Sequence, residues 1–418
     1  MKQVMLLCAA LMAVNPSAKA AAVNLKGTPA IEAAIRAAAR KPEGDLTPAD
    51  LRKITRRGVA GKQINDLTPL AGLTELRQLW LHQNRINNLK PLAGLTKLEK
   101  LTLDANQISD LTPLANCANL KTLHLNENRI TQLVPLANLR KLETLNLWSN
   151  QITNLVALTQ LTKLRSLALT GNRINDLRPL AGLRQLESLD LSQNKLTDLG
   201  PLTGLTNLES LHLQNNQVTD MRPLANLRQL KVLSLQNNRV ADRPPMDLAP
   251  LARLTVLTEL HLTNNQIIEL KPLAEMKELR TLSLWGNQVT NLTSLAGLVK
   301  LKELTLIHNP KLDVPEISKL QAALPKCHIH HNATRTLIQF VNQTKSPITI
   351  RWVNFGGELE TYEESLPPNQ THIQNTYVGH QWILFSKDKK ELGRTFGVGK
   401  IILWAVTEKG LKPVVRKP

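Results

Sequence analysis

Apolar residues in the middle of the chain recur with a fixed period, and one asparagine marks each repeat. The unit at residues 98–117 reads LxxLxLxxNxIxxLxPLxxC, where most positions marked x are polar. The asparagine returns every 22 residues from Asn84 to Asn238, after 27 residues at Asn265, and after two further steps of 22 at Asn309. Such a period predicts a stack of similar supersecondary units, because each unit can bury its apolar side only against its neighbours.

The spacing within one unit predicts its backbone. Leu101 and Leu103 are two residues apart, so on a short strand both side chains point into the core. Asn106 follows where the chain must turn, and its side-chain amide can pair with backbone groups that the turn leaves unpaired. The Pro-Leu segment then returns along the opposite side, where proline costs no ladder hydrogen bond. Eleven such units in phase match the leucine-rich repeat pattern and predict a parallel sheet about 50 Å long.

Helical segments are expected before the repeats. Thr28 and Pro29 open one helix, and Thr47 and Pro48 open a second with a start that resembles a capping box. The terminal repeat of a stack has a bare core, so it needs a cover. We therefore assign residues 21–62 to a helical N-terminal cap.

The repeat solenoid is assigned to residues 63–332. It begins with a degenerate repeat at residues 63–67, where Lys62 stands in the position of the asparagine. It ends with a helix and a strand between Ile317 and Ile329, which are expected to close the other end of the core.

The phase of the repeat identifies the strand residues that face solvent, six, four and two positions before each asparagine. In a curved parallel stack these residues line the concave face. All three tryptophans of the repeats and four histidines fall there, among Ser, Thr and Asn. These tryptophans either pack flat on their neighbours or anchor a protein or peptide partner, with a glycan as another ligand class; we favour an anchor. The expected partner-binding residues are Trp80, His82, His124, Trp148, His212, His261 and Trp285.

The net charge of +19 is not concentrated on this face. The face holds one lysine and the four acids Asp104, Asp190, Glu259 and Glu303. A protein that binds nucleic acid should gather basic charge along its groove. The expected partners therefore do not include nucleic acid.

The segment Cys327–His331 contains metal-ligand residue types without the matching geometry. Alternation along a strand places His328 and His330 on one side and the remaining cysteine and histidine on the other. On the concave face, His82 and His124 lie two coils apart, at about 10 Å, which is too far for two ligands of one ion. We expect no metal and no other cofactor, and we find no nucleophile motif, phosphate loop or carboxylate pair that would indicate catalysis.

The N-terminus has the features of a secretory signal peptide. Lys2 precedes an apolar run from Val4 to Val14, and residues 18–20 (Ala-Lys-Ala) form a small-x-small cleavage site. The run is too short to cross a bilayer. We predict removal of residues 1–20, no membrane span, and a secreted, periplasmic or cell-surface location.

The 22-residue unit, with its Asp-Leu-x-Pro-Leu-Ala-x-Leu return segment and its helical cap, resembles the internalin-type repeats of bacterial surface proteins. The resemblance covers about residues 28–332. It implies a leucine-rich repeat fold with a protein- or glycan-binding surface. Phosphatase-regulating repeat proteins of the cytoplasm share the period, but the signal peptide argues against that class.

The composition changes abruptly after residue 335. All four Phe, both Tyr and the other three Trp lie beyond this point, and the asparagine period stops. Short alternating runs appear at residues 337–341, 348–352, 381–385 and 401–404, separated by turn-forming sequences. Residues 335–418 are therefore predicted to form a small all-β sandwich that follows the α/β solenoid.

The sequence of this region resembles the β domain of the von Hippel–Lindau tumour suppressor. The likeness runs from Ile338 to about Phe385 and includes Trp352-Val-Asn-Phe-x-Gly-Glu, Leu366-Pro-Pro and Tyr377-x-Gly-His-x-Trp. In that family the domain holds a hydroxyproline of its target. The resemblance implies a hydroxyproline-type pocket formed here by Trp352, Tyr362, Thr376, His380 and Trp382.

Such a pocket is chemically reasonable, because a pyrrolidine ring packs well on Trp and Tyr faces and its hydroxyl can bond to Thr376 and His380. Thr376 stands where the family has serine, and one residue is inserted before Leu366. The alternative is that the aromatic residues are an ordinary sandwich core. The family's helical domain, which recruits elongin, has no counterpart, so no ubiquitin-ligase role is implied.

These observations predict a monomeric, non-catalytic protein of the secreted or periplasmic space that takes part in protein–protein interaction. It would bind a protein or peptide on the concave face and a hydroxyproline-type ligand in the β domain. The alternatives are a structural or adhesion protein of the cell envelope that binds anionic surfaces, a cytoplasmic regulator of phosphatases, and an enzyme.

Overall fold

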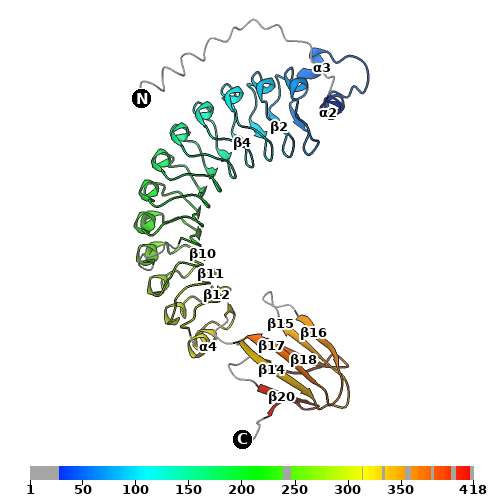
Figure 1. Cartoon of the computed structure of the whole chain (residues 1–418), viewed down its shortest axis with the longest axis vertical. Helices are drawn as coiled ribbons and strands as arrows, with labels where there is room; N and C mark the ends of the chain where they lie inside the picture. The colour runs from blue at the N-terminus through cyan, green and yellow to red at the C-terminus, as the bar shows by residue number, and fades with distance from the viewer. Residues whose placement is uncertain are drawn as a thin grey trace. The chain divides into compact units, whose positions relative to one another are not determined.

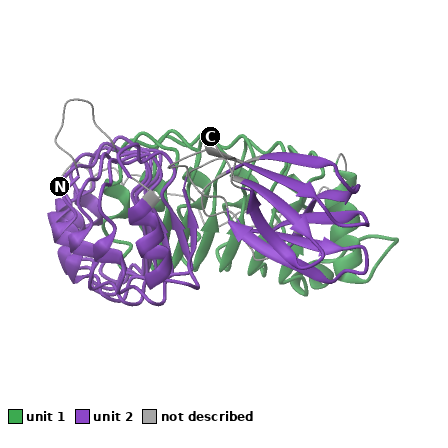
Figure 2. Cartoon of the chain, turned by 90° about the horizontal axis from the view of Figure 1, so that it is seen from below, with its two compact units in different colours: residues 1–174 green, residues 175–418 purple. Residues whose placement is uncertain are grey.

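The computed structural model describes residues 28–238, 246–312, 314–331, 335–353, 359–377, 381–396 and 402–414. The predicted signal peptide at residues 1–20 lies outside them. Contacts group the chain into two compact units, residues 1–174 and residues 175–418 (Figure 2). Thirteen short strands, β1 to β13, form a parallel sheet in chain order, and two four-stranded sheets follow. The predicted α/β solenoid followed by an all-β domain is therefore confirmed.

The first unit opens with the two predicted helices, α2 (Pro29–Ala39) and α3 (Pro48–Arg52). Ile31 and Ile35 are fully buried on one face of α2, as their spacing predicts. The side chain of Thr47 accepts the backbone N–H of Asp50, whose carboxylate accepts the N–H of Thr47, so the capping box is complete.

Most coils of the first unit consist of a three-residue strand, an asparagine turn and a short 3-10 helix (Figure 1). Most of these 3-10 helices have a proline in their first turn. Proline is tolerated there because a backbone N–H in the first turn has no partner within the helix, so its absence costs no hydrogen bond. The strands are β1 (Arg56–Gly58), β2 (Gln78–Trp80), β3 (Lys100–Thr102), β4 (Thr122–His124), β5 (Thr144–Asn146) and β6 (Ser166–Ala168). The 3-10 helices are η1 (Thr68–Leu70), η2 (Lys90–Leu92), η3 (Thr112–Leu114), η4 (Val134–Leu136) and η5 (Val156–Leu158).

The repeated asparagine joins neighbouring coils. The amide nitrogen of Asn106 donates to the carbonyls of Leu81, Leu103 and Asp104 at 2.9–3.1 Å. Its amide oxygen accepts the backbone N–H of Ile86 at 3.0 Å. The asparagine thus satisfies backbone groups of its own turn and of the preceding coil, as predicted for a buried turn.

The second unit continues the repeats. The 27-residue step does not break the sheet, because Val232 of β9 and Glu259 of β10 still pair in register. Its strands are β7 (Ser188–Asp190), β8 (Ser210–His212), β9 (Val232–Ser234), β10 (Glu259–His261), β11 (Thr281–Ser283), β12 (Glu303–Thr305) and β13 (His328–His330). Its helices are η6 (Arg178–Leu180), η7 (Gly200–Leu202), η8 (Arg222–Asn226), η9 (Ala249–Arg253), η10 (Lys271–Leu273), η11 (Thr293–Leu295) and α4 (Val314–Ala323).

The closing segment has the predicted alternation. Cys327 and His331 are buried, whereas His328 and His330 on β13 are half-buried on the other side. The imidazole Nε2 of His330 lies 2.9 Å from the carboxylate of Glu303 on β12. These side chains therefore close the core on one side of the strand and extend the row of strand side chains on the other.

The β domain is a sandwich of two sheets with strand orders β17-β14-β20-β21 and β16-β15-β18-β19. Phe340, Ile350, Trp382 and Val406, which come from both sheets, form part of its buried core. The four predicted runs correspond to β14, β15, β18 and β20. The strands are β14 (Arg335–Asn342), β15 (Ile348–Val353), β16 (Leu359–Leu366), β17 (Thr371–Tyr377), β18 (Gln381–Ser386), β19 (Glu391–Phe396), β20 (Ile402–Thr407) and β21 (Gly410–Val414).

Candidate binding surfaces

The side chains that point away from the leucine core on β1 to β13, and on the residue two positions after each strand, form a surface that we call the sheet face. The central leucine of each strand from β2 to β12 is buried, and its two neighbours are mostly half-exposed. The repeat phase therefore identifies this surface correctly. The predicted partner-binding residues all lie on it and are half-buried, namely Trp80, His82, His124, Trp148, His212, His261 and Trp285.

The tryptophan, histidine and acidic side chains of β2 to β5 form one group, which we call the Asp104 cluster. Thr102 lies between Trp80 and His124 in the strand register. The Trp80 side chain packs over Gly58 on β1, where its Cε3 would lie at the ordinary contact distance of 3.7 Å from a Cβ. The cluster consists of Trp80, His82, Thr102, Asp104, His124, Asn126 and Trp148.

Asp104 is a half-buried carboxylate at the centre of this cluster. Its carboxylate lies 3.9 Å from Nδ1 of His124 and accepts the backbone N–H of Asn126 at 3.3 Å. Burial raises the pKa of Asp104, while the positive charges of His124 and His82 oppose that rise. The folded protein thus destabilises the ionised form, because partial desolvation outweighs the available partners.

Thr102 is the second unusual group of the cluster. It is 5% exposed, and its buried hydroxyl has no hydrogen-bond partner among the residues that the structure describes. A buried polar group without a partner costs about 1–3 kcal/mol. Thr102 is therefore a position where a partner molecule could supply a missing hydrogen bond.

Asn126 connects the acid to the second tryptophan. When its amide nitrogen faces the Asp104 carboxylate, its amide oxygen accepts the indole N–H of Trp148 at 3.2 Å. This orientation satisfies both ends of a buried amide. Trp148 is thereby held with its indole partly in solvent, as a binding anchor requires.

In the second unit, histidines and serines alternate along one row of the sheet face. The ring of His212 lies within hydrogen-bond distance of Ser210 (2.9 Å) and Ser234 (3.0 Å), and that of His261 lies 3.2 Å from Ser283. Burial lowers the pKa of His261, and the nearby carboxylate of Glu259 opposes this shift.

Trp285 makes a different contact from the other two tryptophans. Its ring meets that of His308 edge to face, with 5.0 Å between the ring centroids. The seven predicted partner-binding residues therefore do not form one patch. Four belong to the first unit, with Trp80, His82, His124 and Trp148 in the Asp104 cluster, and three to the second.

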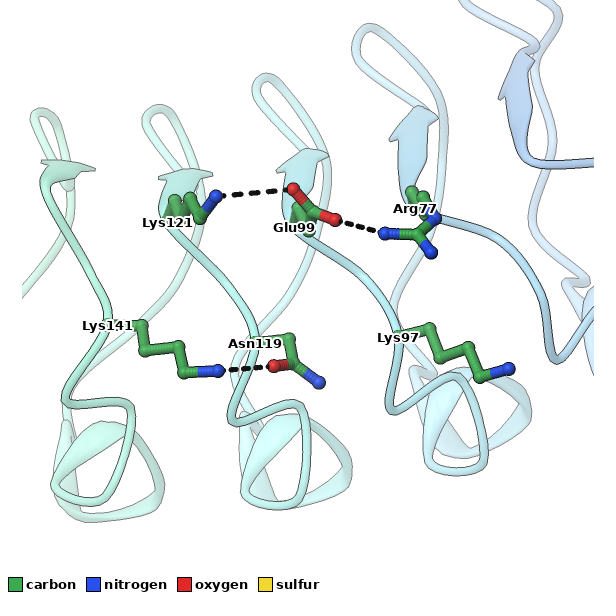
Figure 3. A pocket seen from close by; sticks show the side chains of 6 residues that line it. All are labelled: Arg77, Lys97, Glu99, Asn119, Lys121 and Lys141. Carbon is green, nitrogen blue, oxygen red and sulfur yellow. Dashed lines mark hydrogen bonds and ion pairs between the residues drawn. The ribbon is translucent and has the colours of Figure 1, made fainter.

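Charged side chains form a ladder beside the strands, which the sequence analysis missed. In Figure 3, Arg77, Glu99 and Lys121 follow one another at equivalent positions of successive coils, and Lys141 bonds to Asn119 in a second row. The hydrogen bond from Arg77 lowers the pKa of Glu99. These residues line a depression of about 330 Å³. Because the charges largely pair with one another and are exposed, we interpret the ladder as a weakly stabilising surface feature.

The β domain brings together four of the five residues expected in the hydroxyproline-type pocket. The Tyr362 ring meets Trp382 at a centroid distance of 5.1 Å and Trp352 at 6.2 Å, both edge to face. The indole N–H of Trp382 donates to the hydroxyl of Thr376 at 3.1 Å. Trp382 and Thr376 are only 1% and 2% exposed, whereas Tyr362 is 45% exposed. His380 lies outside the described residues.

Within the described residues, no group of three or more His, Cys, Asp and Glu side chains is arranged to hold a metal ion. Over the same ranges, the helices are too short or too polar to cross a membrane.

Comparisons with known proteins agree with this architecture. Family models described as leucine-rich repeats match within residues 74–319, and the VHL beta domain matches residues 329–392. An internalin (inlF) from Listeria monocytogenes is 32% identical, with a TM-score of 0.68, over 73% of this chain and 90% of its own. A leucine-rich repeat protein of Leptospira interrogans is 24% identical, with a TM-score of 0.59, over 73% of this chain and 98% of its own. No curated protein sequence matches the chain.

The fold defines a leucine-rich repeat scaffold that is followed by a β domain. The chain belongs to the leucine-rich repeat family of internalin type, and its C-terminal region contains a VHL beta domain. The predicted resemblance to both families is therefore confirmed.

Proposed function

We propose that this protein is an exported, non-catalytic binding protein that holds a protein or peptide partner on the sheet face. The observation that carries the proposal is the placement of Trp80, Trp148 and Trp285 as half-exposed side chains on an otherwise polar strand surface. Tryptophan is enriched at the centres of protein interfaces, where it supplies a large apolar area and one hydrogen-bond donor.

The hydrogen bonds of the sheet face also support this proposal. Asn126 holds the indole of Trp148, and His308 packs against that of Trp285. A side chain that is already fixed loses less conformational entropy on binding, so preorganisation favours affinity. Export is supported by the signal-peptide features of residues 1–20.

Replacing Trp148 or Trp285 by alanine is expected to weaken partner binding at least tenfold without loss of the fold. Removal of an interface anchor of this kind typically costs about 2 kcal/mol or more. Binders would be selected from a displayed library of random dodecapeptides against the full chain. Their affinities would then be measured by biolayer interferometry with the parent and both variants.

Val299→Ala is the matched control, because Val299 is exposed away from the strands, on the return segment. It should leave affinity unchanged. Thermal unfolding of all three variants should show a Tm close to that of the parent. Selected binders that tolerate both tryptophan replacements but lose affinity with Val299→Ala would contradict a binding site on the sheet face.

The β domain supports a second binding function, recognition of a hydroxyproline-type residue. The specific observation is that the Tyr362 ring contacts Trp352 and Trp382, that Trp382 donates to Thr376, and that Tyr362 is 45% exposed. Thr376 accepts the indole N–H of Trp382, so its own hydroxyl hydrogen is left to donate to a ligand.

A peptide with 4-hydroxyproline is expected to bind the full chain at least tenfold more tightly than the matched proline peptide. Polar groups arranged for a hydroxyl are left unpaired by the analogue that lacks it, which produces such a preference. Isothermal titration calorimetry would measure both affinities. Tyr362→Ala and His380→Ala should remove the preference, and equal affinities of the parent for the two peptides would argue that these residues are sandwich core alone.

A further inference from the structure

The Asp104 cluster carries an inference about the chemistry of the partner, which rests on the proposed function. On the sheet face of β1 to β6, as the structure describes it, Asp104 is the one carboxylate. Lys100 occupies the same strand four residues earlier, roughly 13 Å along it, and so is no direct partner. The charges that act on Asp104 are those of His124 and His82, and the nearer contact is 3.9 Å long.

Two groups of the cluster thus lack a strong partner. Asp104 is a partly desolvated carboxylate with one backbone N–H, one amide and a distant imidazole around it. Thr102, 95% buried, has a hydroxyl without a hydrogen-bond partner in the described parts of the chain. Both residues lie on β3 or directly after it and face the same side, because they are two positions apart. A ligand with several donors in one plane could serve both oxygens.

We propose that the Asp104 cluster binds an arginine side chain of an extended peptide partner. A guanidinium presents its N–H donors in a planar fork, so it can donate to the Asp104 carboxylate and the Thr102 hydroxyl together. Trp80 lies diagonally across from Asp104 on the neighbouring strand, and its ring extends over Gly58, so its indole flanks the site. An ammonium group lacks this planar fork and fits the site less well.

Trp148, the second tryptophan of the cluster, is the next side chain that the same peptide would contact. Trp148 follows β5, two strands beyond Asp104, which corresponds to about 10 Å across the sheet. An extended chain covers that distance in about three residues. The expected sequence preference is therefore an arginine with an apolar residue three positions away, in a peptide that crosses the strands.

The test uses the full chain with ¹⁵N-labelled tryptophan and the probe acetyl-Ser-Leu-Ser-Ser-Arg-Ser-Ser-Leu-Ser-amide. This probe places leucine on both sides of arginine, so it does not depend on the direction of binding. A second probe replaces arginine by citrulline, which is neutral and nearly isosteric. Indole N–H signals would be followed by NMR and assigned with Trp80→Phe and Trp148→Phe. The arginine probe should shift the Trp80 and Trp148 signals saturably, with a Kd at least tenfold below that of the citrulline probe.

Asp104→Asn should abolish this charge preference, and Thr102→Val should weaken binding of the arginine probe severalfold. Neither change removes a core contact, so the Tm of both variants should stay near that of the parent. Asp190→Asn is the matched control, because Asp190 occupies the sheet face of β7 and bonds to Ser192. This control should keep the full preference.

Equal affinities of the two probes, no saturable shift up to 10 mM, or a preference that survives Asp104→Asn would overturn the arginine site. Titration with methyl α-glucoside tests the competing ligand class. Shifts from that sugar that require Asp104, in the absence of an arginine preference, would overturn the proposal in favour of a glycan. Selected peptides that need Trp148 but contain no arginine would leave the proposed function intact while refuting this inference.

Discussion

Asn128→Ala is expected to lower the free energy of unfolding by about 3 kcal/mol, because two N–H donors and one acceptor, each worth roughly 1 kcal/mol, are lost in a buried turn. The amide of Asn128 donates to the carbonyls of Leu103, Leu125 and Asn126 at 3.0–3.1 Å. Its oxygen accepts the N–H of Ile108 at 2.9 Å. Alanine can replace none of these bonds, and water has little access to the groups left behind. Urea unfolding of the full chain, followed by far-UV circular dichroism, measures the loss.

Asn154→Ala provides the matched comparison. Asn154 belongs to the neighbouring coil, but it is exposed and accepts a single backbone N–H, that of Val156 at 2.8 Å. Water can replace the lost acceptor, so this change should cost less than about 1 kcal/mol. Similar losses for the two variants would contradict the structural role that we assign to the repeated asparagine.

Trp382→Ala is expected to destabilise the β domain by about 3–5 kcal/mol. Trp382 is 1% exposed, packs against Phe340 with 6.3 Å between ring centroids, and donates to Thr376. Its removal creates a large cavity between the two sheets and leaves the Thr376 hydroxyl without its donor. Limited proteolysis should show cleavage after residue 335 under conditions in which the parent is resistant.

Tyr362→Ala separates this core role from a ligand-binding role. Tyr362 is 45% exposed and contacts Trp382 only through its ring, so its loss should cost about 1 kcal/mol. The variant should therefore resist the protease nearly as well as the parent. Equal resistance of the parent and Trp382→Ala would contradict the core assignment.

The repeat architecture follows from local sequence because every coil uses the same chemistry. The period of the asparagine sets the turn, and the leucines two residues apart set the strand, so the residues of the sheet face can be assigned without coordinates. The register survives even the 27-residue step, because the pattern resumes in phase on both sides of it.

The strands of the β domain are harder to predict from the sequence than those of the repeats. Strands β14, β15, β18 and β20 have alternating apolar residues, so the sequence predicts them. The segment 359–366 (LETYEESL) and the segment 371–377 (THIQNTY) form edge strands whose side chains are largely polar. Edge strands commonly have such polar sequences, which protect their open side but weaken the hydrophobic signal.

Parts of the candidate site depend on contacts between side chains of different coils, which the sequence alone does not predict. The burial of Thr102 and the hydrogen bond between Asn126 and Trp148 arise from contacts between coils, so no single repeat predicts them. The charged ladder of Arg77, Glu99 and Lys121 could have been found, because alignment of the repeats places these residues in one column with alternating charge.

The asparagine ladder also has a direction with consequences for synthesis of the chain. The side chain of Asn106 forms hydrogen bonds with the backbone of Leu81 and Ile86 in the coil before it. In the same way, the amide oxygen of Asn84 accepts the backbone N–H of Lys62 in the first, degenerate repeat. A newly made coil therefore keeps part of its turn unpaired until the following 22 residues have been made. At ordinary translation rates this delay is roughly one to four seconds per coil. The growing solenoid thus completes the hydrogen bonds of each turn one repeat behind its last coil.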